Sequence, residues 1–137
     1  MKAEITVDAL IANTNTVIDF LNDFLQKVNC PRKATIQLDI ATEELFVNIA
    51  HYAYAPDQGQ ATIIVEASQD EPAVTVTFID SGKPYDPLAK EDPDVTLSAE
   101  EREIGGLGIY MVKKSMDNMT YAYREGCNHL TIYKRFI

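Results

Sequence analysis

Glu44 and Asn48 place a carboxylate and a carboxamide in a stretch, residues 42–54 ("TEELFVNIAHYAY"), that otherwise resembles a buried helix. Because the two residues are four apart, they share one face of a helix, one turn from each other. Burying such groups without partners is unfavourable, so either they pair with protein groups or they face a cavity that holds a ligand. A carboxylate in this position is a candidate general base, and a carboxamide oxygen is a ligand suited to Mg²⁺.

Asp80 stands where a β-rich run ends, and Ser81 and Gly82 follow it directly. An aspartate and a glycine at a strand end are ordinary turn residues. The functional alternative is that Asp80 accepts a hydrogen bond from an exocyclic amine such as that of adenine. Gly82 would then allow a flat ring to approach the backbone. The residue types alone leave both alternatives open.

A glycine cluster at Gly105, Gly106 and Gly108 precedes a helical pattern. It is either a flexible joint or a phosphate site, because free N–H groups and the macrodipole at a helix start favour anions. It is not a P-loop, since no GxxxxGK[ST] occurs, and it follows an irregular loop instead of the strand that a dinucleotide fingerprint requires. The chain also has no HRD or DFG motif of the common protein kinases.

The elements that must position these residues follow from hydrophobic periodicity. Alternation at residues 4–7 predicts a short strand. Amphipathic spacing predicts a helix over residues 13–28, with Asn13 or Thr14 as its N-cap. A second helix, predicted for residues 32–54, is apolar on most sides and is expected to lie between other elements. His51, near its end, is expected to be a packed or hydrogen-bonded helix residue.

The second half of the chain predicts a sheet. Residues 61–67 and 73–79 are typical of a hairpin, and residues 119–123 and 130–136 of two further strands around a turn at residues 125–128. An irregular, acidic stretch from residue 80 to 103 is long enough to suggest a functional lid. The order of elements predicts an α+β fold, a two-layer α/β sandwich with helices on one face of a mixed, mainly antiparallel sheet.

Composition limits the classes of function. The 137 residues are expected to form a single domain, and the formal charge of −9 argues against nucleic acid or an anionic membrane as a direct partner. Cys30 and Cys127 form no CxxC pair, which favours free thiols in a reducing cytoplasm. The chain has no apolar run of membrane-spanning length and no signal-peptide pattern, so a cytoplasmic location is expected.

The three polar or glycine-rich places form an ordered set of motifs: Glu44-x-x-x-Asn48, Asp80-x-Gly82-x-Pro84 and Gly106-x-Gly108. They resemble the N, G1 and G2 boxes of the Bergerat-fold (GHKL, histidine kinase-like) ATPases. Within that superfamily, "EELFVNIAHYAY", "DSGKPYDP" and "GGLGIYMVKKSMD" are similar to the anti-sigma-factor serine-protein kinases of bacteria. The resemblance spans nearly the whole chain, and three ordered motifs are a specific signal.

The resemblance implies a role for each motif residue. Glu44 would orient or deprotonate a serine hydroxyl of a partner protein, Asn48 would hold Mg²⁺ between the phosphates of ATP, and Asp80 would receive the adenine amino group. Gly82 and Pro84 would lie beside the ring. An ATP lid would cover residues 84–104.

The same resemblance assigns the triphosphate to the end of the lid and the start of the third helix, at Gly105, Gly106, Leu107 and Gly108. Kinase members of the branch often carry an arginine just before these glycines. Ile104 stands there in this chain, and Arg102, two residues earlier, is the candidate to reach the terminal phosphate.

The resemblance therefore implies a serine/threonine-protein kinase, an ATP phosphotransferase, in a partner-switching circuit that regulates transcription. Its substrate would be an antagonist protein of the sulfate-transporter/anti-sigma-antagonist type, its other partner a sigma factor, and its assembly a homodimer. Two alternatives stay open. The first is a module that sequesters a partner under nucleotide control without transferring phosphate, which Ile104 favours, and the second is a detached histidine-kinase catalytic domain.

Overall fold

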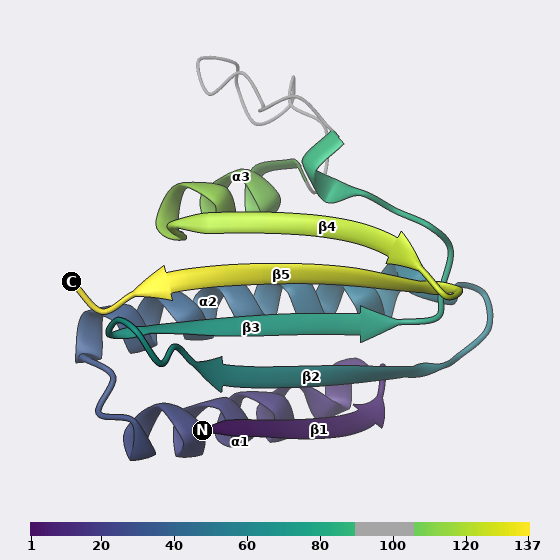
Figure 1. The fold of residues 1–137 in the computed structure, drawn as a ribbon. Helices are drawn as coiled ribbons and strands as arrows, with labels where there is room; N and C mark the ends of the chain where they lie inside the picture. The colour runs from purple at the N-terminus through teal and green to yellow at the C-terminus, as the bar shows by residue number, and fades with distance from the viewer. Residues whose placement is uncertain (90–105) are drawn as a thin grey trace.

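The computed structural model describes residues 1–89 and 106–137, with the backbone alone at residues 106 and 107. This part of the chain forms five strands and three α-helices (Figure 1). Their order is β1 (Lys2–Asp8), α1 (Thr14–Lys27), α2 (Arg32–Asn48), β2 (Gln60–Ala67), β3 (Ala73–Asp80), α3 (Gly106–Ser115), β4 (Asn118–Arg124) and β5 (Cys127–Arg135). Short helical turns at Ile11–Asn13, Ile49–Ala53 and Pro87–Ala89 connect them.

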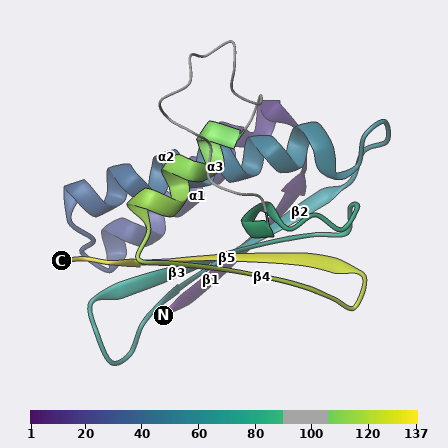
Figure 2. The same ribbon diagram turned by 90° about the horizontal axis from the view of Figure 1, so that it is seen from above.

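The strands form one sheet in the order β1-β2-β3-β5-β4, and each neighbouring pair is antiparallel. The register aligns inward-facing residues in rows, for example Ile63 opposite Phe78 and Phe78 opposite Leu130. All three helices cover the same face of the sheet (Figure 2). The predicted two-layer α+β sandwich is thus confirmed, and its mainly antiparallel sheet is antiparallel throughout.

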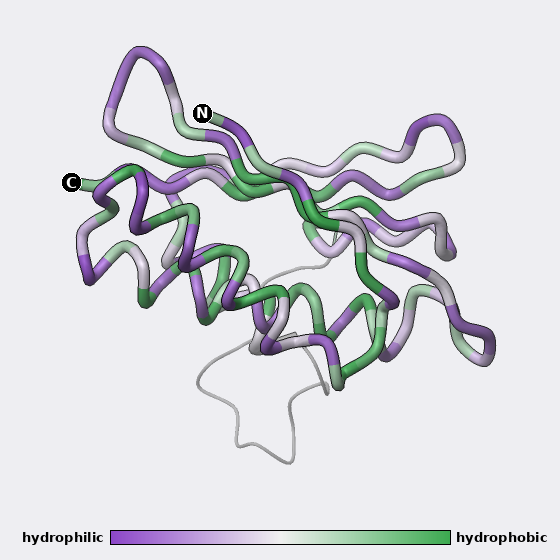
Figure 3. The backbone as a smooth tube through the Cα atoms, turned by 90° about the horizontal axis from the view of Figure 1, so that it is seen from below, coloured by the Kyte–Doolittle hydropathy of each residue, from purple (hydrophilic) through white to green (hydrophobic). Residues whose placement is uncertain are grey.

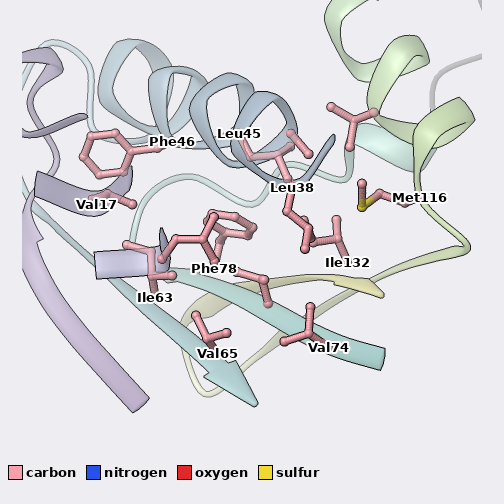
Figure 4. Close-up of a cluster of buried hydrophobic side chains, with 14 of the residues drawn as sticks. Val17, Leu38, Leu45, Phe46, Ile63, Val65, Val74, Phe78, Met116 and Ile132 are labelled. Carbon is pink, nitrogen blue, oxygen red and sulfur yellow. The ribbon is translucent and has the colours of Figure 1, made fainter. Parts of the chain in front are cut away.

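The core lies between the two layers (Figure 4). Along most of β2 and β3, buried positions recur every second residue. The turns at the ends of the sheet are mostly hydrophilic (Figure 3). Phe46 of α2 and Phe78 of β3 are the largest of the fully buried side chains. Around them pack Val17, Leu21, Leu25, Leu38, Leu45, Ile63, Val65, Val74, Val76 and Ile132. This shared core fixes α2 over the centre of the sheet.

Helix α2 contacts both α1 and α3, as expected for a helix that lies between other elements. Its apolar residues are not all buried, however: the side chains of Ile36 and Ile40 are 47% and 60% exposed. The helix layer has no further element over α2 in the described residues, so its outer face stays open to solvent. The helix thus lies between α1 and α3 as predicted, but the face that carries these two isoleucines is exposed.

The start of α1 also differs from the prediction. Neither Asn13 nor Thr14 caps the helix with its side chain: Asn13 Nδ2 donates to the Asp8 carbonyl (2.8 Å), and Thr14 Oγ1 donates to the Ile11 carbonyl (2.7 Å). Both side chains act as donors toward the preceding turn. They therefore hold the β1–α1 connection instead of satisfying N–H groups of the helix.

The predicted turn at residues 125–128 was too long. Glu125 and Gly126 alone form the turn, with φ of 55° and 76°, and β5 begins at Cys127. Two consecutive positive φ angles are the geometry of a tight two-residue hairpin. As a consequence, Asn128 is a strand residue opposite both Tyr123 and Asp80.

Several predicted features lie outside the described residues: Arg102, Ile104, Gly105 and most of the expected lid at residues 84–104. The helices that are described include none long and apolar enough to cross a bilayer. Cys30 and Cys127 are both free thiols. His51 lies in the turn after α2, where its exposed ring makes an edge contact with Tyr52 at 5.7 Å between ring centroids.

Candidate functional site

A cavity of about 520 Å³ opens between the helix layer and one end of the sheet. Its wall comes from the last turns of α2, the end of β3 and the loop after it, the first half of α3, and the β4–β5 hairpin. This volume is in the range of about 300–1,000 Å³ that is typical of small-molecule sites. Three of the predicted site residues, Asn48, Asp80 and Pro84, line it.

Asp80 is the last residue of β3, and it is buried, with 7% of its surface exposed. Its Oδ1 accepts two hydrogen bonds of 2.9 Å, from the Gly82 backbone N–H and from Asn128 Nδ2. Within the described residues Oδ2 has no hydrogen-bond partner. The carboxylate therefore offers one acceptor oxygen to a donor in the cavity.

The packing of the loop against the end of α2 requires a glycine at position 82. A Cβ at this position would overlap the carbonyl group of Ala53, and the next residue, Lys83, donates its backbone N–H to the same Ala53 oxygen (2.9 Å). Gly82 is not among the described residues that line the cavity. The close approach that requires glycine here is thus between two backbone segments.

Tyr54, the residue after Ala53, holds the same loop from the α2 side as well. The Tyr54 hydroxyl accepts a hydrogen bond from the Ser81 backbone N–H (2.7 Å) and donates one to the Gln60 carbonyl (2.6 Å). Tyr54 follows the π-helical turn Ile49–Ala53 that ends α2. Such turns occur frequently at functional sites. In this chain the turn links the helix of Asn48 to the loop of Asp80.

Asn128 is the site residue that the sequence did not reveal. It is 6% exposed and lines the cavity. Its Nδ2 donates to Asp80 Oδ1 and to the Lys83 carbonyl (2.9 Å each), and its Oδ1 accepts hydrogen bonds from the Tyr85 N–H (3.1 Å) and the Tyr121 hydroxyl. One signal was available: extending the inward-facing alternation of Ile132 and Leu130 back by two residues reaches Asn128.

The Tyr121 phenol is part of this network. Its partial burial raises its pKa, the hydrogen bond with the Tyr85 backbone opposes that effect, and the nearby carboxylates of Asp86 and Asp80 add to the increase. A phenol with a raised pKa stays protonated at neutral pH and can donate to Asn128.

Glu44 lies one helical turn before Asn48 on α2, and its side chain contacts α3. A Cβ at Gly108 would overlap the Glu44 carboxylate, so these two residues, distant in the sequence, lie directly against each other. Glu44 is partly exposed. The structure therefore brings the first and third predicted motifs together at the first turn of α3, where Gly106 and Leu107 contribute backbone.

The arrangement combines a half-buried carboxylate, a carboxamide and a helix start beside a mostly apolar cavity, and Asp80 contributes a carboxylate acceptor to the lining of that cavity. Comparison with known proteins identifies the family of the chain. Residues 7–134 match the family model described as the histidine kinase-like ATPase domain. This chain belongs to that family. Its predicted membership is confirmed, and an ATPase domain uses ATP.

The histidine kinase-like ATPase domain of this chain is similar to several bacterial protein kinases. It is 30% identical over 95 residues to serine/threonine-protein kinase BtrW of Bordetella bronchiseptica, which covers 69% of this chain and 66% of the relative. It is 29% identical to serine-protein kinase RsbW of Listeria monocytogenes, with 69% and 62% covered, and to RsbW of Bacillus cereus, with 65% and 57% covered. The matches thus span less than two thirds of these relatives.

The fold has a counterpart among solved structures. The chain superimposes on the structure of the RsbU and RsbW domains of Rv1364c from Mycobacterium tuberculosis with a TM-score of 0.70 and 18% identity. The superposition covers 98% of this chain and 32% of that one. At this identity the likeness establishes the shared fold.

Proposed function

We propose that this chain is an ATP-dependent serine/threonine-protein kinase of the anti-sigma-factor type. The observation that carries the proposal is the convergence of three motifs on one cavity: Asn48 and Asp80 line it, and Glu44 lies against Gly108 beside it. The names of the relatives, serine- and serine/threonine-protein kinases, support the same activity. Residues 1–137 would act as one ATPase domain, in the cytoplasm.

The adenine ring would occupy the apolar part of the cavity, with its amino group donating to Asp80 Oδ2. Leu45, Phe78 and Leu130 supply apolar wall on the helix and sheet sides, and Pro84 lies at the edge of the loop. Hydrophobic burial of the ring then provides binding free energy, while the single acceptor supplies orientation.

Asn48 would hold Mg²⁺ through its carboxamide oxygen. In the described residues no cluster of three or more His, Cys, Asp or Glu side chains is arranged to bind a metal by itself. Mg²⁺ usually keeps several waters and takes one or two protein ligands together with substrate phosphates, so a lone carboxamide beside a triphosphate suits it. The ion would neutralise phosphate charge.

The triphosphate would run from the cavity toward the first turn of α3, where the N–H groups of Gly106, Leu107 and Gly108 face an anion favourably. Arg102 and Gly105 belong to the proposed contacts through the motif resemblance alone, as does a lid at residues 84–104. Phosphoryl transfer depends mainly on positioning and charge neutralisation, so these groups can suffice.

Glu44 would act on the attacking hydroxyl. It would take the proton of a serine on the partner protein as that oxygen bonds to the γ-phosphorus and the bond to the β-phosphate oxygen breaks, which leaves ADP and phosphoserine. The partial exposure of Glu44 lets a protein substrate reach it. A positioned base of this kind contributes about 10²–10⁴-fold to the rate.

The proposed substrate is an antagonist protein of the sulfate-transporter/anti-sigma-antagonist type, with a sigma factor as the competing partner and a homodimer as the working assembly. The test incubates the purified chain with γ-labelled ATP, Mg²⁺ and such an antagonist. We expect label on serine, and far slower labelling with Glu44→Gln. Label on histidine would indicate histidine-kinase chemistry.

A second outcome would overturn the kinase but not the site. If ATP binds and controls association with the antagonist while no label is transferred, the chain is a nucleotide-controlled sequestering module, the function that Ile104 favours. If calorimetry with ATP and Mg²⁺ gives no heat of binding for folded protein, the site itself is wrong.

A further inference from the structure

We propose that Asn128 is a positioning residue that sets the purine selectivity of the site by fixing the Asp80 carboxylate and the loop that follows it. The inference rests on the proposed function, because it presumes that a purine nucleotide occupies the cavity. Asn128 comes from β5 and the loop follows β3, so the residue ties together two parts of the chain that are adjacent only in the folded sheet.

The hydrogen bonds of Asn128 determine the orientation of its amide. An asparagine side chain has two N–H donors and an oxygen with two lone pairs. Both donors are used, on Asp80 Oδ1 and the Lys83 carbonyl, and both acceptor positions are filled, by the Tyr85 N–H and the Tyr121 hydroxyl. With all four positions taken by protein groups, Asn128 acts on a bound base through Asp80.

The bond to Asp80 decides which carboxylate oxygen a ligand meets. Asn128 Nδ2 and the Gly82 N–H both donate to Oδ1. These two hydrogen bonds fix the orientation of the carboxylate. Oδ2 is left as a pure acceptor. A 6-amino purine can donate to it. In the same pose, a 6-oxo purine presents a second acceptor and leaves Oδ2 unpaired.

The hydrogen bonds from Asn128 to the loop also position the wall of the cavity. Asn128 holds the backbone of Lys83 and Tyr85 from the sheet side, while Tyr54 and Ala53 hold Ser81 and Lys83 from the α2 side. Lys83 and Tyr85 both line the cavity. Removing Asn128 would release one side of this wall as well as the carboxylate.

The test measures binding of ATP and of inosine triphosphate (ITP), which carries a 6-oxo group in place of the 6-amino group, by calorimetry with Mg²⁺. The wild-type chain should prefer ATP by about 10- to 100-fold, since an unpaired buried acceptor costs that order of affinity. Asn128→Leu keeps a similar shape and removes all four bonds. We expect it to weaken ATP binding more than ITP binding, so that the preference falls to about 3-fold or less.

A second variant covers the case in which Asn128→Leu does not fold. Tyr121→Phe removes only the hydroxyl that donates to Asn128, and any change in ring contacts affects ATP and ITP alike. We expect the ATP preference to fall by about 2- to 5-fold, the order expected for one hydrogen bond. His129→Leu is the matched control, because it changes the neighbouring residue on the opposite face of the same strand, and its preference should equal that of the wild type.

A double variant tests whether Asn128 acts through Asp80. Asp80→Asn should lower the ATP preference by itself, and adding Asn128→Leu should change the preference by less than about 2-fold, since residues that act as one unit are not additive. A folded Asn128→Leu or Tyr121→Phe protein with the wild-type ATP preference would overturn the inference alone. A wild-type chain that binds neither nucleotide would overturn the proposed function together with it.

Discussion

Glu44 shows how one side chain can be assigned a role from its surroundings. It is partly exposed, it lies one turn from Asn48, and its carboxylate packs against a glycine at the start of α3. A purely structural glutamate on the surface of a helix would not require glycine opposite it. The contact with Gly108 therefore supports a site in which the carboxylate is held in one place.

The first prediction concerns this carboxylate. Glu44→Gln should lower the rate of phosphoryl transfer to the antagonist by about 10²–10⁴-fold, because the proton acceptor is lost. ATP affinity, measured by calorimetry, should stay within a few-fold of the wild type, because the amide keeps the shape of the side chain. Glu43→Gln, at an exposed neighbour on the same helix, is the control. A Glu44→Gln protein with wild-type transfer would remove Glu44 from the proposed mechanism.

At the scale of elements, the end of α2 and the loop after β3 depend on each other. Gly82→Ala should destabilise the fold by about 1–3 kcal/mol, the usual cost of overpacking, because its methyl group would overlap the Ala53 carbonyl group and a backbone group cannot rotate away. ATP affinity should fall too, since the loop carries Asp80. Urea unfolding and calorimetry measure both effects. Ser81→Ala, one residue earlier, should leave both the free energy of unfolding and the ATP affinity close to those of the wild type.

The interface of α1 and α2 contains a carboxyl group whose burial is unfavourable. Desolvation raises the pKa of Asp39, and the hydrogen bond from Asn22 Nδ2 (3.1 Å) offsets this only in part. A carboxyl group with a raised pKa in the folded state binds its proton more tightly than in the unfolded state. Its contribution to stability is thus present below its ordinary pKa of 3.8 and is lost as the pH rises through the raised value.

Asp39→Asn should therefore raise the melting temperature at pH 7. It should also make the free energy of unfolding depend less on pH just above 3.8. The asparagine can still accept a hydrogen bond from Asn22. Thermal unfolding of wild type and variant across pH 3.5 to 7, roughly the range over which carboxyl groups titrate, gives the measurement. Asp23→Asn, on the exposed face of α1, controls for the change in net charge. Equal melting temperatures for wild type and Asp39→Asn at pH 7 would contradict the prediction.

For the molecule as a whole, a single core holds the helix layer on the sheet and thereby shapes the cavity. Phe46 is 0% exposed at the centre of this core. Phe46→Ala should lower the free energy of unfolding by about 3–5 kcal/mol, through lost burial and the space left behind. Ile40→Ala on the exposed side of the same helix should cost only about 0.5 kcal/mol or less. Urea unfolding of both variants checks the difference, and similar losses would contradict the assignment of the core.

Local pattern predicted much of this architecture. The alternation of β1, β2 and β3 and the helical spacing of α1 agree with the structure to within a few residues, because these periods reflect one buried face each. The helix predicted for residues 32–54 was too long, since α2 ends at Asn48 and a π-helical turn follows it. Where a prediction depended on more than the period, it was less reliable. Asn13 and Thr14 donate to the preceding turn instead of capping α1. The turn before β5 is shorter than expected, so Asn128 lies in the sheet and not in the predicted turn.

The order of elements and the three motifs follow from the amino-acid sequence, because each consists of residues close together in the chain. Only the folded chain brings Glu44 against Gly108, Gly82 against Ala53, and Asn128 within hydrogen-bond distance of Asp80. These contacts join segments 29 to 64 residues apart, as the residue numbers show. Such contacts depend on strand register, a two-residue turn and the packing of α2, which short-range periodicity does not encode.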